Sequence, residues 1–203
     1  MAKKLTTKEF NALPKNKKVV LVAKDVIAQL DAKRYISQTG RYIYNLKTVD
    51  GEIINGEINK NFDKIKSCQV CALGSMLMSC THLGNKLTTS DLDINYIAMT
   101  SELRNDKVSK LFKSIFDPHT LLLIETSYEG YDPFTGVSYK EIKKSDFEYS
   151  KEGARYGHDI EDESLTFEEA YKAEMFFRKY KKDDSRLRAI CNNLISNKGT
   201  FKP

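Results

Sequence analysis

One segment decides the fold: SCQVCALGSMLMSC, residues 67–80. The protein is 30% charged, yet no Asp, Glu, Lys or Arg occurs between Lys66 and Lys86. A helix that is apolar on every side has no face for water, so it belongs in the interior of a domain. We therefore predict a buried central helix over about 69–81, in which the small residue Gly74 lets neighbouring elements approach closely.

Helical patterns lie on both sides of this segment. The region 15–33 repeats apolar residues at helical spacing on one face. Three later helices are marked by capping residues, namely Asp117–Pro118 with Gly130, the capping box Thr166–Glu169, and Asp183 or Asp184 with Gly199. These signals predict a mainly helical bundle that forms a single domain over residues 1–203.

A small β-hairpin is expected before the central segment. The apolar stretches 41–49 and 52–58 flank Asp50–Gly51, which is a strong hairpin-turn signal. We place the hairpin near 41–58. After it, Ile58, Phe62 and Ile65 are spaced as on a helix that leads into the central segment.

The stretch 131–163 differs from the rest of the chain, because it combines glycines with aromatic and charged residues. It is too long for a plain connection, which indicates an insert or long loop within the domain. Aromatic side chains with a polar tip anchor protein interfaces well, although here they could equally pack the insert onto the helices. We predict partner-binding residues in this insert: Tyr131, Phe134, Tyr139, Tyr149 and Tyr156.

Composition limits the class of partner. The net charge is +5, from 33 basic and 28 acidic residues that are interspersed, whereas nucleic-acid binders usually concentrate Lys and Arg on one face. A mildly basic N-terminus, Lys3–Lys18, leaves a nucleic-acid partner open. Residues 1–14 lack the apolar core of a signal peptide, and the uncharged stretch 67–85 holds too many polar residues for a membrane span.

The four cysteines indicate the redox compartment of the protein. Cys68, Cys71 and Cys80 lie in what we predict to be one helical stretch, and Cys191 lies on an apolar helix face. Without a secretory signal, reduced thiols in a cytosol are the better interpretation.

The sequence resembles a group of proteins encoded by bacteriophages and related bacterial elements. The resemblance rests on Cys68–Gly74 (CQVCALG), Arg186–Ile190 (RLRAI) and Asn197–Phe201 (NKGTF). It implies a phage or mobile-element origin and a bacterial host cytoplasm, or association with the virion. The group has no established activity, so it implies no catalytic residue.

A cysteine hydrolase is the alternative. A thiolate of Cys71, or of Cys68, near a helix N-terminus would have a lowered pKa, and the free N–H groups could hold an oxyanion. The text from Cys68 to Ser75 also resembles the helix-starting segment of papain-like cysteine proteases, but no aromatic residue follows Cys71. The base would be His119 or His158. His82 lies eleven residues away along one helix, about 16 Å.

Metal and redox sites fit less well. On a continuous helix Cys80 stands about 13 Å from Cys71, too far for two sulfurs to bind one zinc ion. A thioredoxin-like site would follow a buried strand, whereas the stretch 63–67 is polar. The acidic clusters at 91–93 and 159–163 match no calcium-loop pattern. We predict no metal and no cofactor.

These observations favour a non-enzymatic phage or mobile-element accessory protein. It would act by binding a host or phage protein, for example to inhibit a host system, with no role for a membrane. Specificity would lie in the aromatic insert, and the charge-free segment would be interior scaffolding.

Overall fold

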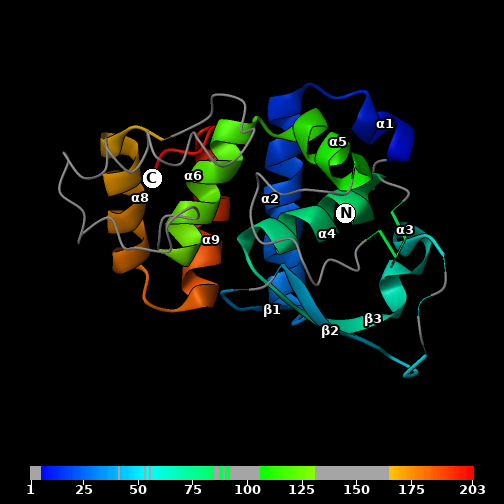
Figure 1. Ribbon diagram of the computed structural model, residues 1–203. Coiled ribbons are helices and arrows are strands. Elements are labelled where there is room, and N and C mark those ends of the chain that lie inside the picture. The colour runs from blue at the N-terminus through cyan, green and yellow to red at the C-terminus, as the bar shows by residue number, and fades with distance from the viewer. Residues whose placement is uncertain are drawn as a thin grey trace.

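The structure is a computed structural model (Figure 1). It describes the following residues: 6–40, 42–52, 54, 56–84, 87–88, 90–91, 106–130 and 165–203. Helices dominate these residues, and one small three-stranded sheet accompanies them. The predicted mainly helical class is confirmed. The predicted insert, 131–163, lies outside the described residues.

The helices occur throughout the described chain. Their bounds are α1 (Thr7–Asn11), α2 (Lys15–Asp31), α3 (Ile58–Asn61), α4 (Ala72–Gly84), α5 (Asp106–Ile115), α6 (Pro118–Glu129), α8 (Phe167–Lys179) and α9 (Asp183–Ser196). A short 3₁₀ turn, η1 (Phe62–Lys64), follows α3. None of the described helices is long and apolar enough to cross a membrane.

The sheet contains β1 (Tyr35–Ser37), β2 (Ile43–Thr48) and β3 (Ile65–Val70) in the order β1-β3-β2. The central strand β3 runs parallel to β1 and antiparallel to β2. Its inner face is buried, and on the other face one cross-strand row joins Ile36 to Gln69 and Gln69 to Tyr44.

The central helix is buried as predicted, but it begins at Ala72, because residues 65–70 form β3. Cys68 therefore lies on a strand, and the prediction that it lies in one helical stretch with Cys71 and Cys80 is wrong. The argument that no buried strand precedes the cysteines is also wrong, because Ile65, Cys68 and Val70 are buried within β3. The segment 65–70 (IKSCQV) mixes apolar and polar residues and is too short for its pattern to separate a strand from a helix, which explains the error.

In the described part of 41–58, β2 is the strand, its antiparallel partner is β3, and Glu57 forms an isolated bridge with Thr88. The predicted partner stretch 52–58 instead ends in α3, which begins at Ile58. Gly51 has a φ of 78°, as a turn residue requires, and the turn lies in the connection from β2 to β3. The Asp50–Gly51 signal thus correctly predicted a turn after β2. The strand that pairs with β2, however, is β3 and not the stretch directly after the turn.

Several predicted helix ends are confirmed. Thr166 and Glu169 form a capping box at α8, and Asp117 caps α6, which ends at Gly130 in the left-handed conformation. The predicted cap of the last helix is wrong by one or two residues, because α9 begins after Lys182, which makes no side-chain cap. The carboxylate of Asp183 instead contacts the N–H of Thr39 and the side chain of Arg186.

The core forms around α4 and the inner face of the sheet. Helix α2 packs against both α4 and α9, and α6 packs against both α8 and α4. Figure 1 shows α4 crossing α2, with α6, α8 and α9 on one side of α2 and the sheet below α4. The first residues of α9 thereby come close to the end of α6 and to the turn after β1.

Candidate functional site

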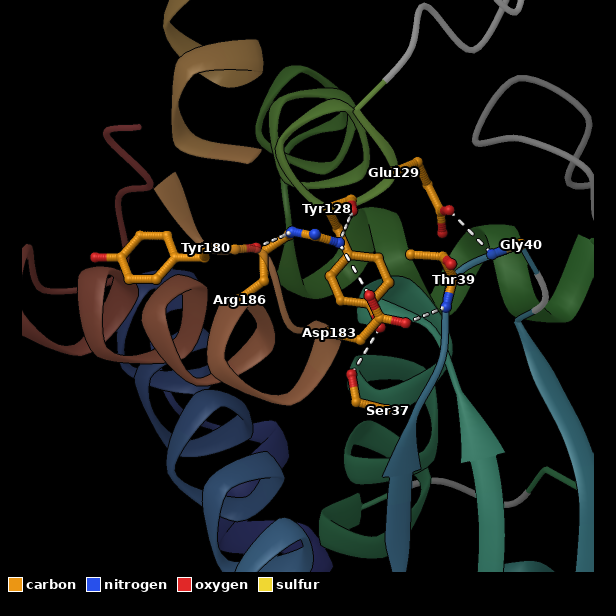
Figure 2. A network of polar contacts seen from close by, with 8 residues as sticks. All are labelled: Ser37, Thr39, Gly40, Tyr128, Glu129, Tyr180, Asp183 and Arg186. Carbon is orange, nitrogen blue, oxygen red and sulfur yellow. Dashed lines mark hydrogen bonds and ion pairs between the residues drawn. The ribbon is translucent and has the colours of Figure 1, made fainter. Parts of the chain in front are cut away.

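The candidate site lies where β1 and β3 end. Because these strands are parallel, their carboxyl ends meet at one edge of the sheet, where β3 passes through Cys71 into α4 and β1 passes into the turn at residues 38–40. This position, beyond the carboxyl ends of parallel strands, is where open sheets with helices usually bind ligands. The end of α6 and the start of α9 complete the site (Figure 2).

Cys71 lies at the junction between strand and helix. Its backbone N–H donates to the carbonyl of Tyr42 over 3.2 Å, and its Sγ accepts a hydrogen bond of 3.4 Å from the N–H of Gly74. The thiol therefore caps the first turn of α4, although Ser, Thr or Asp is the usual cap. Tyr42 packs so closely that its carbonyl oxygen lies against the backbone of Gly74.

The thiol of Cys71 lies in the interior, where the residue is only 5% exposed. Burial raises its pKa well above the ordinary value, and the charge of Glu129 raises it further. We expected the helix N-terminus to lower this pKa, but desolvation outweighs the hydrogen bond from Gly74. Burial likewise raises the pKa of Cys68 to about 12.

The described histidines face carboxylates. His119 lies in the first turn of α6, and its Nε2 is 3.3 Å from Oε1 of Glu169 on α8. In the described part of the chain, its ring makes no hydrogen bond with Cys71, so the structure does not bring the predicted pair together. His158 lies outside the described residues.

His82, near the end of α4, forms a separate cluster. Its Nδ1 is 3.0 Å from Oδ1 of Asp25, and its ring stacks on Phe62 with centroids 3.9 Å apart. Gln29 donates to the same oxygen of Asp25. Over the described ranges, no group of three or more His, Cys, Asp or Glu side chains could hold a metal ion.

Arg186 is the central cation of the candidate site. It is only 3% exposed, and it joins the ends of α6 and α8 to the start of α9. Its Nη1 donates to the carbonyl of Tyr128 over 2.8 Å and to Asp183 over 3.2 Å, and its Nε donates to the carbonyl of Tyr180 over 2.9 Å (Figure 2). The guanidinium also lies 4.0 Å from the ring centroid of Phe177. A buried guanidinium needs such partners to offset its lost hydration.

Two carboxylates hold the turn after β1. Oδ2 of Asp183 accepts from the N–H of Thr39 over 3.0 Å, and Oε2 of Glu129 accepts from the N–H of Gly40 over 2.9 Å. Figure 2 shows both carboxylates directed at this turn from two different helices. Nearby, the hydroxyls of Ser37 and Tyr128 share a hydrogen bond of 2.6 Å.

Two titratable groups of the site, Glu129 and Tyr42, have raised pKa values. Burial raises the pKa of Glu129 from 4.5 to about 8, with further contributions from Glu125 and Asp183. Burial, followed by the charge of Glu125, also raises the pKa of Tyr42, whose hydroxyl lies 3.4 Å from Glu125. The site thus carries a carboxyl that takes up a proton near neutral pH.

Sequence reasoning placed none of Arg186, Asp183 and Glu129 in a functional site, and it assigned Asp183 only a possible capping role. One available signal was the pair Glu125 and Glu129 at i, i+4 in an otherwise largely apolar helix, because buried carboxylates require partners. The identity of those partners depends on the tertiary structure, since Gly40 is 89 residues away in the chain.

A second feature is the outer face of the sheet. Ile36 is 48% exposed and Tyr44 is 39% exposed, and both flank Gln69 in the cross-strand row. Single exposed apolar residues are ordinary, but a row on three adjacent strands is a small contact surface. The predicted binding residues Tyr131, Phe134, Tyr139, Tyr149 and Tyr156 lie outside the described residues.

Comparisons with protein families, with curated proteins and with solved structures find no match to this chain. Fold and site therefore define the class: a mainly helical protein with a three-stranded sheet and a buried polar cluster at the strand ends.

Proposed function

We propose that this protein is a non-enzymatic accessory protein of a bacteriophage or other mobile element, which acts in the bacterial host cytoplasm by binding a protein partner. One observation carries the proposal: Ile36 and Tyr44, which flank Gln69 in the cross-strand row, are partly exposed on the outer face of the sheet. The phage origin rests on the resemblance of the segments around Cys68 and Arg186.

The charge of the strands favours one kind of partner. The three strands contain two charged residues, the exposed lysines Lys47 and Lys66, and no Asp or Glu. Lys47 lies on β2 beside Ser67 of β3. Charge complementarity therefore favours a protein surface that combines acidic side chains with an apolar centre. Inhibition of a host system would follow if that surface is needed for the function of the host protein.

The aromatic insert is the second part of the proposal. Its residues Tyr131, Phe134, Tyr139, Tyr149 and Tyr156 remain predicted contacts, since aromatic anchors dominate many interfaces. A virion-associated role would use the same residues against another phage protein.

The competing function is a small cysteine hydrolase based on Cys71. The burial and raised pKa of this thiol argue against it, because the thiolate is the reactive form. A Cys71→Ala variant separates the two functions, since a binding protein retains partner capture and a hydrolase loses its nucleophile.

The experiment begins with tagged full-length protein and lysate from host or infected cells, followed by reconstitution with the purified captured protein. The test variant is Ile36→Ser/Tyr44→Ser, and the matched control is Tyr171→Ser/Met175→Ser, which removes two exposed apolar residues from α8. We expect the test variant to bind at least about tenfold more weakly, as two lost apolar contacts imply, and the control to bind normally. Affinity should also fall with salt.

Equal binding by both variants and the unmodified protein would exclude the sheet face. A further variant with the five insert aromatics changed to Ser then tests the insert. If all variants bind equally, the proposed binding surfaces are wrong.

A further inference from the structure

One end of the molecule combines two segments that are far apart in the sequence. Helix α2 begins there at Lys15, and α9 ends there at Ser196. A Cβ atom at Gly199 would lie 2.6 Å from the carbonyl oxygen of Asn16, so the chain after α9 packs directly against the first turn of α2. Figure 1 shows the start of α2 and the segment after α9 on the upper side of the molecule, away from the sheet.

Both segments are basic. The stretches 14–24 and 190–203 contain no Asp or Glu, and together they hold six lysines: Lys15, Lys17, Lys18, Lys24, Lys198 and Lys202. Lys18 is partly exposed, and the other five are exposed. Within the part of the chain that the structure describes, none of the six side chains forms an ion pair or a hydrogen bond. The fold therefore gathers positive charge that is divided in the sequence, and we call the surface of these six lysines the basic end.

The segment after α9 has a fixed position. Asn193 on α9 accepts a hydrogen bond from the N–H of Lys202 over 2.9 Å, and its side-chain amide donates to the carbonyl of the same residue. Phe201 is buried, and its ring packs against Phe176 of α8 with the centroids 5.5 Å apart. Because the backbone is already held, binding a ligand here avoids the entropy loss of ordering a flexible tail.

The stability of α2 does not explain its lysines. The first turn of the helix contains no acidic residue, and Pro14 at the N-cap makes no side-chain hydrogen bond. The helix dipole is positive at this end, so Lys15, Lys17 and Lys18 oppose it instead of complementing it. A polyanion beside the basic end would offset this repulsion.

The composition of the surface selects among polyanions. A membrane-binding surface combines Lys with exposed apolar side chains that enter the lipid, and a protein interface usually has an apolar centre. Among the described residues, the exposed large apolar side chains all lie outside the stretches 14–24 and 190–203. The one aromatic residue of these stretches, Phe201, is buried and cannot stack on a base. Lysines without such neighbours suit contacts to phosphates, which carry no sequence information.

We propose that the basic end binds the phosphate backbone of a nucleic acid, without preference for base sequence. Helix α2 has 17 residues and separates the basic end from the sheet by its length, about 25 Å. The surface is therefore distinct from the outer sheet face, and the inference is independent of the proposed function. Either can fail without the other, because one is measured with nucleic acid and the other with a protein.

The experiment measures binding of the full-length protein to a short, fluorescently labelled DNA duplex, and to an RNA duplex of equal length, by fluorescence anisotropy. Phosphate contacts alone give a dissociation constant of about 10⁻⁴–10⁻⁶ M at physiological salt. Each contact contributes a slope of about −0.9 to the dependence of log affinity on log salt concentration. With four lysines in contact, the affinity for DNA should fall about 100-fold between 50 and 200 mM salt.

Two variants with equal loss of charge separate the basic end from the net charge. The test variant replaces four exposed lysines of the basic end: Lys15→Gln, Lys17→Gln, Lys198→Gln and Lys202→Gln. The matched control replaces four exposed lysines in or next to the strands: Lys33→Gln, Lys47→Gln, Lys64→Gln and Lys66→Gln. At 50 mM salt the test variant should bind at least about tenfold more weakly, with a shallower salt dependence. The control should stay within about threefold of the unmodified protein, because its lysines lie beyond a Debye length of about 10 Å from the basic end.

Three results would overturn the inference. The first is no binding to either duplex at 50 mM salt, and the second is an equal loss of affinity in both variants. The third is binding to phosphatidylserine vesicles or to polyglutamate without binding to a duplex, which would assign the surface to a membrane or to an acidic protein. If the test variant does not fold, NMR of the unmodified protein decides, because the duplex must then shift the amide signals of Lys17 and Lys198 and not those of β2.

Discussion

The carbonyl oxygen of Tyr42 lies 1.6 Å from the position that a Cβ atom would occupy at Gly74. No side chain fits there, and the nearest obstacle is backbone rather than a flexible side-chain end. The β2 strand begins beside this contact, so Gly74 is what allows the sheet to approach α4.

We therefore expect Gly74→Ala to destabilise the protein by about 3 kcal/mol or more, the upper range for overpacking. The measurement is urea unfolding followed by circular dichroism. Gly51→Ala is the matched control, because Gly51 has open space around it and only a positive φ to disturb. It should cost about 1 kcal/mol. Equal losses for both variants would mean that the contact with Tyr42 is not limiting.

Arg186 should be the most sensitive residue of the polar cluster. Replacing it by Met leaves Asp183 and the carbonyls of Tyr128 and Tyr180 without their donor. The pair with Asp183 is only partly buried, so the main cost is that of buried acceptors left without a donor, about 1–3 kcal/mol each, and the Arg186→Met protein should unfold at much lower urea concentration. Arg188→Met is the control, since Arg188 pairs with Asp31 and Asp184 at the surface and should cost about 1 kcal/mol or less.

Cys71 should resist alkylation in the folded protein. Because the thiol is buried and its pKa is raised, iodoacetamide at pH 6 should label it only after unfolding in urea. Mass spectrometry of digested protein measures the labelling of each cysteine. Rapid labelling of Cys71 alone in the native state would instead support the hydrolase.

Stability should decrease as the pH rises, and Glu129 should be responsible. Its pKa is about 8 in the folded protein and 4.5 without the burial, so the folded state binds more protons between these values. Its contribution is therefore complete below about pH 4.5 and is lost as the pH rises toward 8. Urea unfolding from pH 5 to pH 9 should show this decrease in the unmodified protein and a flatter profile in Glu129→Gln. Parallel profiles would contradict the assignment.

Much of the helical architecture could be predicted from local sequence. The apolar spacing of α2, the capping box at Thr166 and the Asp117–Pro118 start of α6 each specify a helix through contacts within a few residues. The absence of charge in residues 67–85 likewise predicted a buried centre, and α4 is that centre. These features depend on residues that are close together in the sequence, so they can be predicted from the sequence alone.

The strand β3 and the polar cluster could not be predicted in the same way. Residues 65–70 are a strand because β1 and β2 pair with them on both sides, and a short segment of mixed polarity does not reveal its partners. Arg186, Glu129 and Asp183 are ordinary surface residue types until α9 packs against α2 and beside the end of α6.

By itself, the sequence determined the helical class, the buried segment and several helix ends, because hydrophobic periodicity and capping act over one or two turns. Only the tertiary structure decided that Cys71 caps a helix as a buried thiol and that Glu129 and Asp183 hold one turn. Those properties depend on desolvation and on contacts between residues that are dozens of positions apart, and such contacts exist only once the chain has folded.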